Sequence, residues 1–277
     1  MKPASFEYEK PTDAGTCLSA LGSEAEFAKA LAGGQSLGPM MNLRLAQPDR
    51  LIDISGLDTL RQVSLRDDSL FVGALTTHAA IEDGHIPDVS GGMLRYVASG
   101  IGYRAIRNKG TIGGSVVHAD PAGDWPSALL GLGADVRVLG PDGERSVALS
   151  DFQIGAFTVA LAPEELVLGV EVPMLTESAR WGYYKVCPKP GDFADSIGVF
   201  VNDPGRGFCR AVLGATETNP MMLSISESDL RDWPATPLSL ARCKAMIEDL
   251  EAGFDADTAG LHAVSLQRAA AMAGTRP

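Results

Sequence analysis

The sequence predicts an α+β protein of two parts, and three observations lead to this prediction. The chain has 277 residues, enough to bury a sizeable core, and its length suggests about two domains. Its 45% of apolar and 21% of charged residues are ordinary for globular proteins. Strand-like and helix-like patterns occur on both sides of a polar link, "LTESAR", that follows Pro173. We therefore expect one domain over 1–175 and another over 176–277.

The first part begins with patterns that conflict. The stretch from Asp13 to Ala30 predicts a helix, but a loop that binds phosphate commonly follows a strand, so the residues just before Gly33 could be extended instead. "RLIDIS" then alternates as a strand, and "VSLRDDSLFV" predicts a hairpin around Asp67 and Asp68. "LTTHAAIED" predicts a short helix with a threonine cap.

Further elements follow in order. "GGMLRYVAS" predicts a helix, "WPSALLGL" a helix with a proline in its first turn, "ADVRVLG" a strand, and "EELVLGVEVP" a strand that ends at Pro173. Beyond the link, "WGYYKVC", "SIGVFVN" and "FCRAVLGAT" have strand patterns. "LSLARCKAMIEDLEAG" and "TAGLHAVSLQRAAAMAG" have the pattern of amphipathic helices, so the second part is also α+β.

Charge and composition exclude several classes of protein. A formal net charge of −12, with no stripe of Lys and Arg, excludes nucleic acid and anionic lipid as partners. No apolar run approaches the roughly 18 residues of a membrane span, and the polar N-terminal stretch lacks the features of a signal peptide, so we expect a cytoplasmic protein. A small phosphorylated ligand is compatible with this charge, because local backbone donors decide such a site.

Two glycine loops are the strongest motif. "AGGQS" (Ala32–Ser36) and "TIGGS" (Thr111–Ser115) lie about 80 residues apart, and each combines a glycine pair with a hydroxyl. Consecutive backbone N–H groups without a Cβ nearby are suited to a diphosphate, although a simple turn is the alternative for each loop. "GIGYRA" also fits the dinucleotide pattern G-x-G-x-x-A, but it follows a helical pattern instead of a strand, which argues against a Rossmann site.

Candidate metal ligands are few. The four cysteines (17, 187, 209 and 243) form no C-x-x-C pair, so we expect reduced thiols and neither zinc nor an iron–sulfur cluster in this chain. "HADPAGDWP" places His118, Asp120 and Asp124 around a proline turn, a spacing that could serve metal or acid–base chemistry, but one histidine makes a metal site improbable. Two interpretations of these aspartates remain: one of them caps the next helix, or one contacts a hydroxyl of a ligand.

Three segments together carry a family resemblance. "LAGGQSLGPMMNLRLAQPDRLIDISGL", "IRNKGTIGGSVVHADPAGDWPSALLGLGADV" and "ELVLGVEVP" resemble the FAD-binding medium subunit of bacterial molybdenum hydroxylases, the group of carbon monoxide dehydrogenase and of the flavin segment of xanthine dehydrogenase. The resemblance implies an FAD-binding domain of the vanillyl-alcohol-oxidase/PCMH type, with subdomains of about 1–55 and 56–175. It also implies a smaller C-terminal domain of the carbon monoxide dehydrogenase flavoprotein type.

The resemblance also implies a set of FAD-binding residues. The two loops would hold the diphosphate, Ile101 would pack on the cofactor, Asp124 would meet its ribityl or ribose part, and Val167 and Lys185 would lie near the flavin ring. A cation at that position would raise the flavin potential. His118 and Asp120 match the family's "HADP" run. The complete set is Ala32, Gly33, Gly34, Gln35, Ser36, Ile101, Thr111, Ile112, Gly113, Gly114, Ser115, His118, Asp120, Asp124, Val167 and Lys185.

The sequence departs from the family pattern in two places. Tyr103 and Arg104 stand where relatives often carry a His-Pro-like pair. Pro188 and Pro190 interrupt a run that is usually basic and unbroken. The second departure bears on the geometry around Lys185.

The function implied by the resemblance is electron transfer within a complex. A large partner subunit would carry a molybdenum–pterin cofactor, a small one two [2Fe–2S] clusters, and this chain FAD. The complex could be a dimer of heterotrimers. Electrons would leave from FAD to an external acceptor; the substrate and the acceptor are left open. A stand-alone FAD oxidase or reductase and a non-redox nucleotide-binding module are the alternatives.

Overall fold

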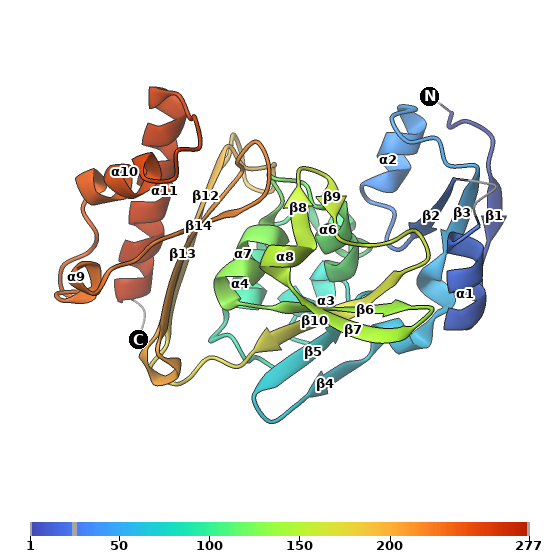
Figure 1. Cartoon of the computed structure of the whole chain (residues 1–277), viewed down its shortest axis with the longest axis horizontal. Helices are drawn as coiled ribbons and strands as arrows, with labels where there is room; N and C mark the ends of the chain where they lie inside the picture. Colours follow the sequence, from blue (N-terminus) through green and yellow to red (C-terminus); the bar gives the residue numbers. More distant parts are fainter. Residues whose placement is uncertain (1, 24–26, 276–277) are drawn as a thin grey trace.

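Three main β-sheets follow one another along the chain, and Figure 1 shows them side by side with helices between and beside them. The computed structural model describes residues 2–23 and 27–275. Helices and strands are mixed throughout, which confirms the predicted α+β class.

The N-terminal sheet is parallel, with strand order β1-β3-β2. The predicted helix from Asp13 to Ala30 is wrong beyond its first turns: the helix ends at Leu21, and the chain is extended again from Ala28, while residues 24–26 lie outside the described residues. Pairing with β3 overrides the local helix preference of this stretch. The elements are β1 (Glu7–Glu9), α1 (Ala14–Leu21), β2 (Ala28–Leu31), α2 (Leu37–Asn42) and β3 (Arg50–Asp53).

The central sheet is antiparallel, in the order β4-β5-β10-β6-β7. The hairpin around Asp67 and Asp68 and the helix capped by Thr77 are confirmed. Helix α6 was not predicted, because its glycine pair is typical of a turn. The elements are η1 (Ile54–Gly56), η2 (Asp58–Arg61), β4 (Val63–Leu65), β5 (Ser69–Gly73), α3 (His78–Glu82), α4 (Met93–Ser99), α5 (Arg104–Arg107), α6 (Ile112–His118), α7 (Asp124–Leu132), β6 (Asp135–Gly140), β7 (Gly143–Ala148), α8 (Leu149–Phe152), β8 (Gln153–Gly155), β9 (Thr158–Val159) and β10 (Leu166–Pro173).

The C-terminal sheet is antiparallel, in the order β11-β12-β13-β14, and lies between two layers of helices. Helices α10 and α11 cover one face, and α4 and α7 lie on the other side (Figure 1). The predicted strands and both long helices are confirmed. The elements are β11 (Arg180–Val186), β12 (Ser196–Asp203), η3 (Pro204–Arg206), β13 (Phe208–Gly214), β14 (Met221–Leu223), α9 (Glu227–Leu230), α10 (Leu240–Glu248) and α11 (Ala256–Thr275).

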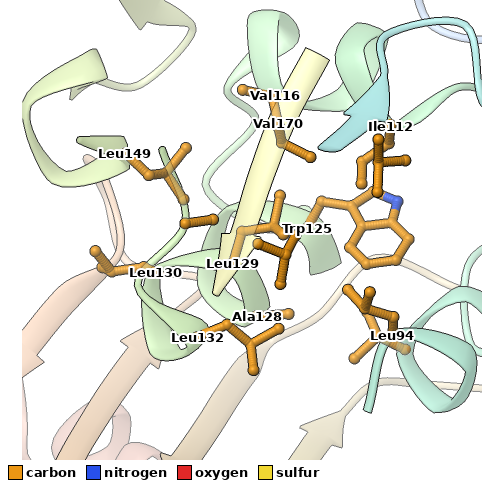
Figure 2. Close-up of a cluster of buried hydrophobic side chains, with 14 of the residues drawn as sticks. Leu94, Ile112, Val116, Trp125, Ala128, Leu129, Leu130, Leu132, Leu149 and Val170 are labelled. Atoms are coloured by element: carbon orange, nitrogen blue, oxygen red, sulfur yellow. The ribbon is translucent and has the colours of Figure 1, made fainter. Parts of the chain in front are cut away.

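Helix α7 is the centre of the main core. All its residues are buried, because the central elements pack on one side of it and the C-terminal sheet on the other. Figure 2 shows the indole of Trp125 between Ile112 and Leu94, with the leucines of α7 continuing the cluster. The same cluster includes Val199 and Val212 of the C-terminal sheet. One hydrophobic core therefore extends across the link that follows β10.

Candidate functional site

The two glycine loops meet, although about 80 residues separate them in the sequence. A Cβ built on Gly33 would lie 1.8 Å from the carbonyl oxygen of Lys109 and 3.0 Å from the Cα of Gly110. A Cβ on Gly114 would lie 3.9 Å from the Cβ of Ala32. The loops therefore form one wall, and only glycine at position 33 permits this contact.

The first loop presents unused backbone donors. It runs from the end of β2 to the start of α2, and Gly34 has a left-handed φ of 69°. Within the described chain, no backbone amide from Gly33 to Ser36 donates a hydrogen bond, and the Ser36 hydroxyl does not cap α2. The Gln35 side chain folds back to the Gly33 carbonyl at 3.0 Å. Consecutive free N–H groups of this kind are suited to a phosphate or diphosphate.

The second loop differs from the sequence expectation, because its amides are already used inside the protein. It forms the first turn of α6, capped by Thr111. Ile112 and Gly113 are buried, while Gly114 and Ser115 are partly exposed, and the Ser115 hydroxyl has no partner in the described chain. This loop therefore offers the Ser115 hydroxyl, and its Gly114 backbone lies close to Ala32 of the first loop. The amides of residues 112–115 donate, in order, to the oxygens Thr76 O (3.0 Å), Ala74 O (3.1 Å), Thr111 Oγ1 (3.1 Å) and Thr111 O (3.0 Å).

A buried polar group joins helix α7 to strand β11. The Lys185 ammonium lies 2.9 Å from the Asp124 carboxylate, and the Tyr183 hydroxyl donates to the same carboxylate at 2.6 Å. Burial raises the pKa of Asp124 above its ordinary value, and the Lys185 charge counteracts part of that rise. Burial, with the Asp124 charge, also raises the pKa of Tyr183 well above 10. Gly123 is the N-cap of α7, so the expectation that an aspartate side chain caps this helix is wrong for Asp124.

A surface cavity of about 470 Å³ is lined by residues from 102–106 and 188–195. Ile101 is partly buried against the main core, and the next residues, Gly102 and Tyr103, line the cavity from one side. Pro188 and Phe193 line it from the segment that follows β11. Both departures from the family pattern therefore contribute to one cavity. The motif "GIGYRA" (100–105) runs from the end of α4 into α5, so a helix precedes it where a Rossmann site needs a strand.

The remaining predicted residues lie in separate environments. Val167 is buried in β10, opposite Val138. His118 is the last residue of α6, with its ring 5.2 Å from that of Phe157 and its Nε2 3.9 Å from the Asp120 carboxylate. Burial lowers the pKa of His118, and Asp120 opposes that shift. No group of three or more potential metal ligands occurs in residues 2–23 or 27–275.

The sequence did not point to His78, which lies directly behind the second loop. Its backbone amide donates to the Gly110 carbonyl at 3.0 Å, and its Nδ1 accepts from the indole nitrogen of Trp125 at 3.0 Å. Burial, with a smaller contribution from the Arg107 charge, lowers the pKa of His78 to about 4. The only local signal was the threonine cap of its helix, which does not reveal a tertiary contact.

A comparison with protein families decides which family this site belongs to. Residues 4–175 match the family described as the FAD binding domain in molybdopterin dehydrogenase. The chain belongs to this family. The match confirms the resemblance stated from the sequence, the cofactor FAD, and the class of oxidoreductase subunit.

Relatives of this FAD-binding chain are known in sequence and in structure. The carbon monoxide dehydrogenase medium chain of Hydrogenophaga pseudoflava is 35% identical over 224 residues, which cover 80% of this chain and 78% of that one. A solved structure of the Hydrogenophaga pseudoflava carbon monoxide dehydrogenase that lacks the Mo-pyranopterin moiety of its cofactor has a TM-score of 0.85 and 29% identity, with 99% of this chain and 98% of that chain covered. Quinoline 2-oxidoreductase of Pseudomonas putida 86 has a TM-score of 0.83 and 26% identity, with the same coverage. The fold is therefore that of a molybdenum hydroxylase FAD subunit.

Proposed function

We propose that the chain is the FAD-carrying electron-transfer subunit of a molybdenum hydroxylase. It would receive electrons from two [2Fe–2S] clusters of a small subunit, in a complex whose large subunit holds a molybdenum–pterin cofactor, and deliver them to an external acceptor. The observation that carries the proposal is the meeting of the two glycine loops, with free amides in the first loop. The similarity to a carbon monoxide dehydrogenase medium chain supports the partners, and a dimer of heterotrimers is the arrangement we expect.

The residues present have the donors and the cavity that FAD would need. The free amides of Gly33 to Ser36 and the hydroxyls of Ser36 and Ser115 would hold the diphosphate. The cavity beside Gly102 would take the ring, with Ile101 and Lys185 near it. Bound there, FAD supplies a carrier that accepts and releases electrons one or two at a time. The chain's own residues orient it and keep it from diffusing away between electron donor and acceptor.

The assignment of the other predicted contacts is part of the same proposal. Asp124 is held rigidly by Lys185 and Tyr183, so its carboxylate is in place to meet a ribityl or ribose hydroxyl. Val167 would support the cofactor from within the core. His118 and Asp120 lie at the far end of α6 from its capped first turn, which makes them the outermost members of the proposed set.

We also propose the domain division and the location of the complex. Boundaries at about 55/56 and 175/176 agree with the grouping of strands, since β1–β3 form one sheet, β4–β7 with β10 a second, and β11–β14 a third. Of the helices in the described ranges, none is both long and apolar enough to cross a membrane. The cytoplasm is the compartment that we propose.

The proposal is tested by purifying the tagged chain from the cells that make it. We expect a yellow preparation in which FAD, molybdenum and iron occur together with two further polypeptides. Size-exclusion chromatography in buffer without chelators separates the complex. Elemental analysis and flavin absorbance then measure its molybdenum, iron and FAD content. An active yellow chain without metal-bearing partners would instead support the stand-alone FAD oxidase, and a colourless chain that takes up no FAD would overturn both.

A further inference from the structure

We infer that Arg107 is a positioning residue that sets the backbone wall of the proposed FAD cavity. Three successive carbonyl groups, those of residues 100–102, each accept a hydrogen bond from a side-chain cation. Lys185 donates to the Gly100 oxygen at 2.9 Å. One guanidinium nitrogen of Arg107, Nη1, donates to the Ile101 oxygen at 3.1 Å and to the Gly102 oxygen at 2.9 Å. Arg107 thus determines where these two peptides lie.

Arg107 is itself held by Glu82 of helix α3. Its Nε and Nη2 each donate to one carboxylate oxygen of Glu82 at 2.8 Å, and its side chain is only 12% exposed. A planar guanidinium can bind a carboxylate along one edge and present Nη1 to other acceptors, which a lysine ammonium cannot do in the same geometry. The pair therefore connects α3 to the 101–102 backbone through one rigid group.

The backbone that Arg107 holds is linked along the chain to both the cavity and the first glycine loop. Gly102 lines the cavity, and its amide donates to the carbonyl of Gly191 on the opposite side at 3.0 Å. Helix α5 then carries the chain to Lys109 and Gly110, which contact Gly33. Displacement of residues 101–102 would therefore disturb the cavity and the segment that contacts the first loop together. This inference rests on the proposed placement of FAD along that path.

Arg104 provides a matched control on the same helix. It also donates to Glu82, at 2.8 Å, and it pairs with Asp83. Its side chain is 48% exposed, and its hydrogen bonds within the described chain go to Glu82, Asp83 and Asn108, none to residues 100–102. Arg107→Met leaves Glu82 paired with Arg104, so the substitution does not isolate a buried carboxylate.

The test compares Arg107→Met, Arg107→Lys and Arg104→Met in the full chain. Apo protein is titrated with FAD, and the visible circular dichroism of the bound flavin and the melting temperature of each apo variant are recorded. We expect both Arg107 variants to bind FAD about tenfold more weakly with an altered dichroism spectrum, and Arg104→Met to stay within about twofold of the parent chain. Glu82→Gln should change the spectrum in the same direction.

Two results would overturn the inference. One is an Arg107→Met chain with the FAD affinity and dichroism of the parent. The other is an Arg107→Lys chain with parental FAD affinity and dichroism, which would mean that the positive charge, and not the planar guanidinium geometry, positions the backbone. If Arg107→Met fails to fold, Arg107→Lys and Glu82→Gln decide the question with smaller changes. A parent chain that binds no FAD would reject the proposed function instead, so the two failures are distinguishable.

Discussion

At the scale of single residues, the site is defined by which loop amides remain free to donate and by the buried pair of Lys185 and Asp124. The glycine pairs with nearby hydroxyls were recognisable as candidate diphosphate loops from the sequence. Which backbone amides stay free was not recognisable, because the amides of the second loop donate to oxygens of Thr111, Thr76 and Ala74. Likewise, Lys185 and Asp124 are 61 positions apart, and nothing in their local patterns indicates that they form a buried pair.

Gly33→Ala should disrupt the contact between the loops. The new Cβ would meet the Lys109 carbonyl at 1.8 Å, so one of the two backbones must move. We expect FAD affinity to fall more than about tenfold and apo stability to fall by about 1–3 kcal/mol. Gly38→Ala is the control, because a Cβ there meets nothing within 4 Å and should leave FAD binding intact. Equal FAD affinity in the two variants, measured by flavin titration, would contradict the shared wall.

Lys185→Met should lower the midpoint potential of the bound flavin. Reduction adds negative charge to the cofactor, and removal of the ammonium leaves the Asp124 carboxylate without its cation. We expect a fall on the order of tens of millivolts, limited because Asp124 already offsets part of the charge. Lys189→Met, which removes an exposed ammonium from the next segment, serves as the comparison. An unchanged midpoint in Lys185→Met, measured by dye-coupled reduction, argues against the proposed role.

His78 should make the fold sensitive to mild acid. The pKa of His78 is about 4 in the folded chain, whereas the ordinary histidine pKa is 6.5. Between these pH values the unfolded chain binds a proton at His78 and the folded chain does not. Stability is therefore lost as pH falls from about 6.5 toward 4, by about 2 kcal/mol between pH 7.5 and 5. His78→Asn keeps an acceptor for Trp125 and should lose this part of the pH dependence. Urea unfolding at both pH values checks it; parallel losses in the two proteins would exclude His78 as the cause.

At the scale of elements, strands with alternating patterns and long helices were predictable, and short elements at the loops were not. The residues before Gly33 favour a helix locally, but β2 is extended because β3 offers it a parallel partner. Helix α6 begins at a glycine pair because Thr111 caps it and Gly113 packs against Ala74, where a Cβ would come within 2.5 Å. Local propensity reflects neither the pairing of β2 with β3 nor the contact of Gly113 with Ala74, because both depend on residues distant in the sequence.

Helix α11 lies so close to the C-terminal sheet that glycine is required beneath it. A Cβ on Gly182 would lie 1.9 Å from the Ala269 carbonyl oxygen, whereas a Cβ on Gly260, within α11, meets nothing within 4 Å. We expect Gly182→Ala to destabilise the chain by about 1–3 kcal/mol and Gly260→Ala to stabilise it by up to about 1 kcal/mol. Thermal or urea unfolding measures both. If Gly182→Ala melts no lower than the parent, α11 does not pack as closely as described.

In the whole molecule, the two predicted parts share one core. Trp181 and Tyr183 of β11 belong to the same buried cluster as Trp125 of α7. Hydrogen bonds cross the same junction: the Trp181 indole donates to the Gly91 carbonyl at 2.8 Å, and the Tyr183 hydroxyl donates to Asp124. The polar link after Pro173 was visible in the sequence, but the size of the interface was not, because both faces that meet there consist of ordinary buried residues.

This shared core predicts that the chain unfolds as a unit. A chain that ends after residue 175 contains the whole match to the FAD-binding family, yet it lacks the sheet that covers one side of α7. Every residue of helix α7 is buried and most are apolar, so the truncated chain would expose a large apolar surface and leave Asp124 without its cation.

We therefore expect residues 1–175 alone to aggregate or to lack a cooperative transition, and the full chain to melt in one step. Coexpression of 1–175 with 176–277 should restore a soluble complex that binds FAD, because the missing face is then supplied in trans. Calorimetry and flavin titration measure both outcomes. A fragment of 1–175 that melts at the temperature of the full chain would show that the interface contributes little, and that the two parts are energetically independent despite their common core.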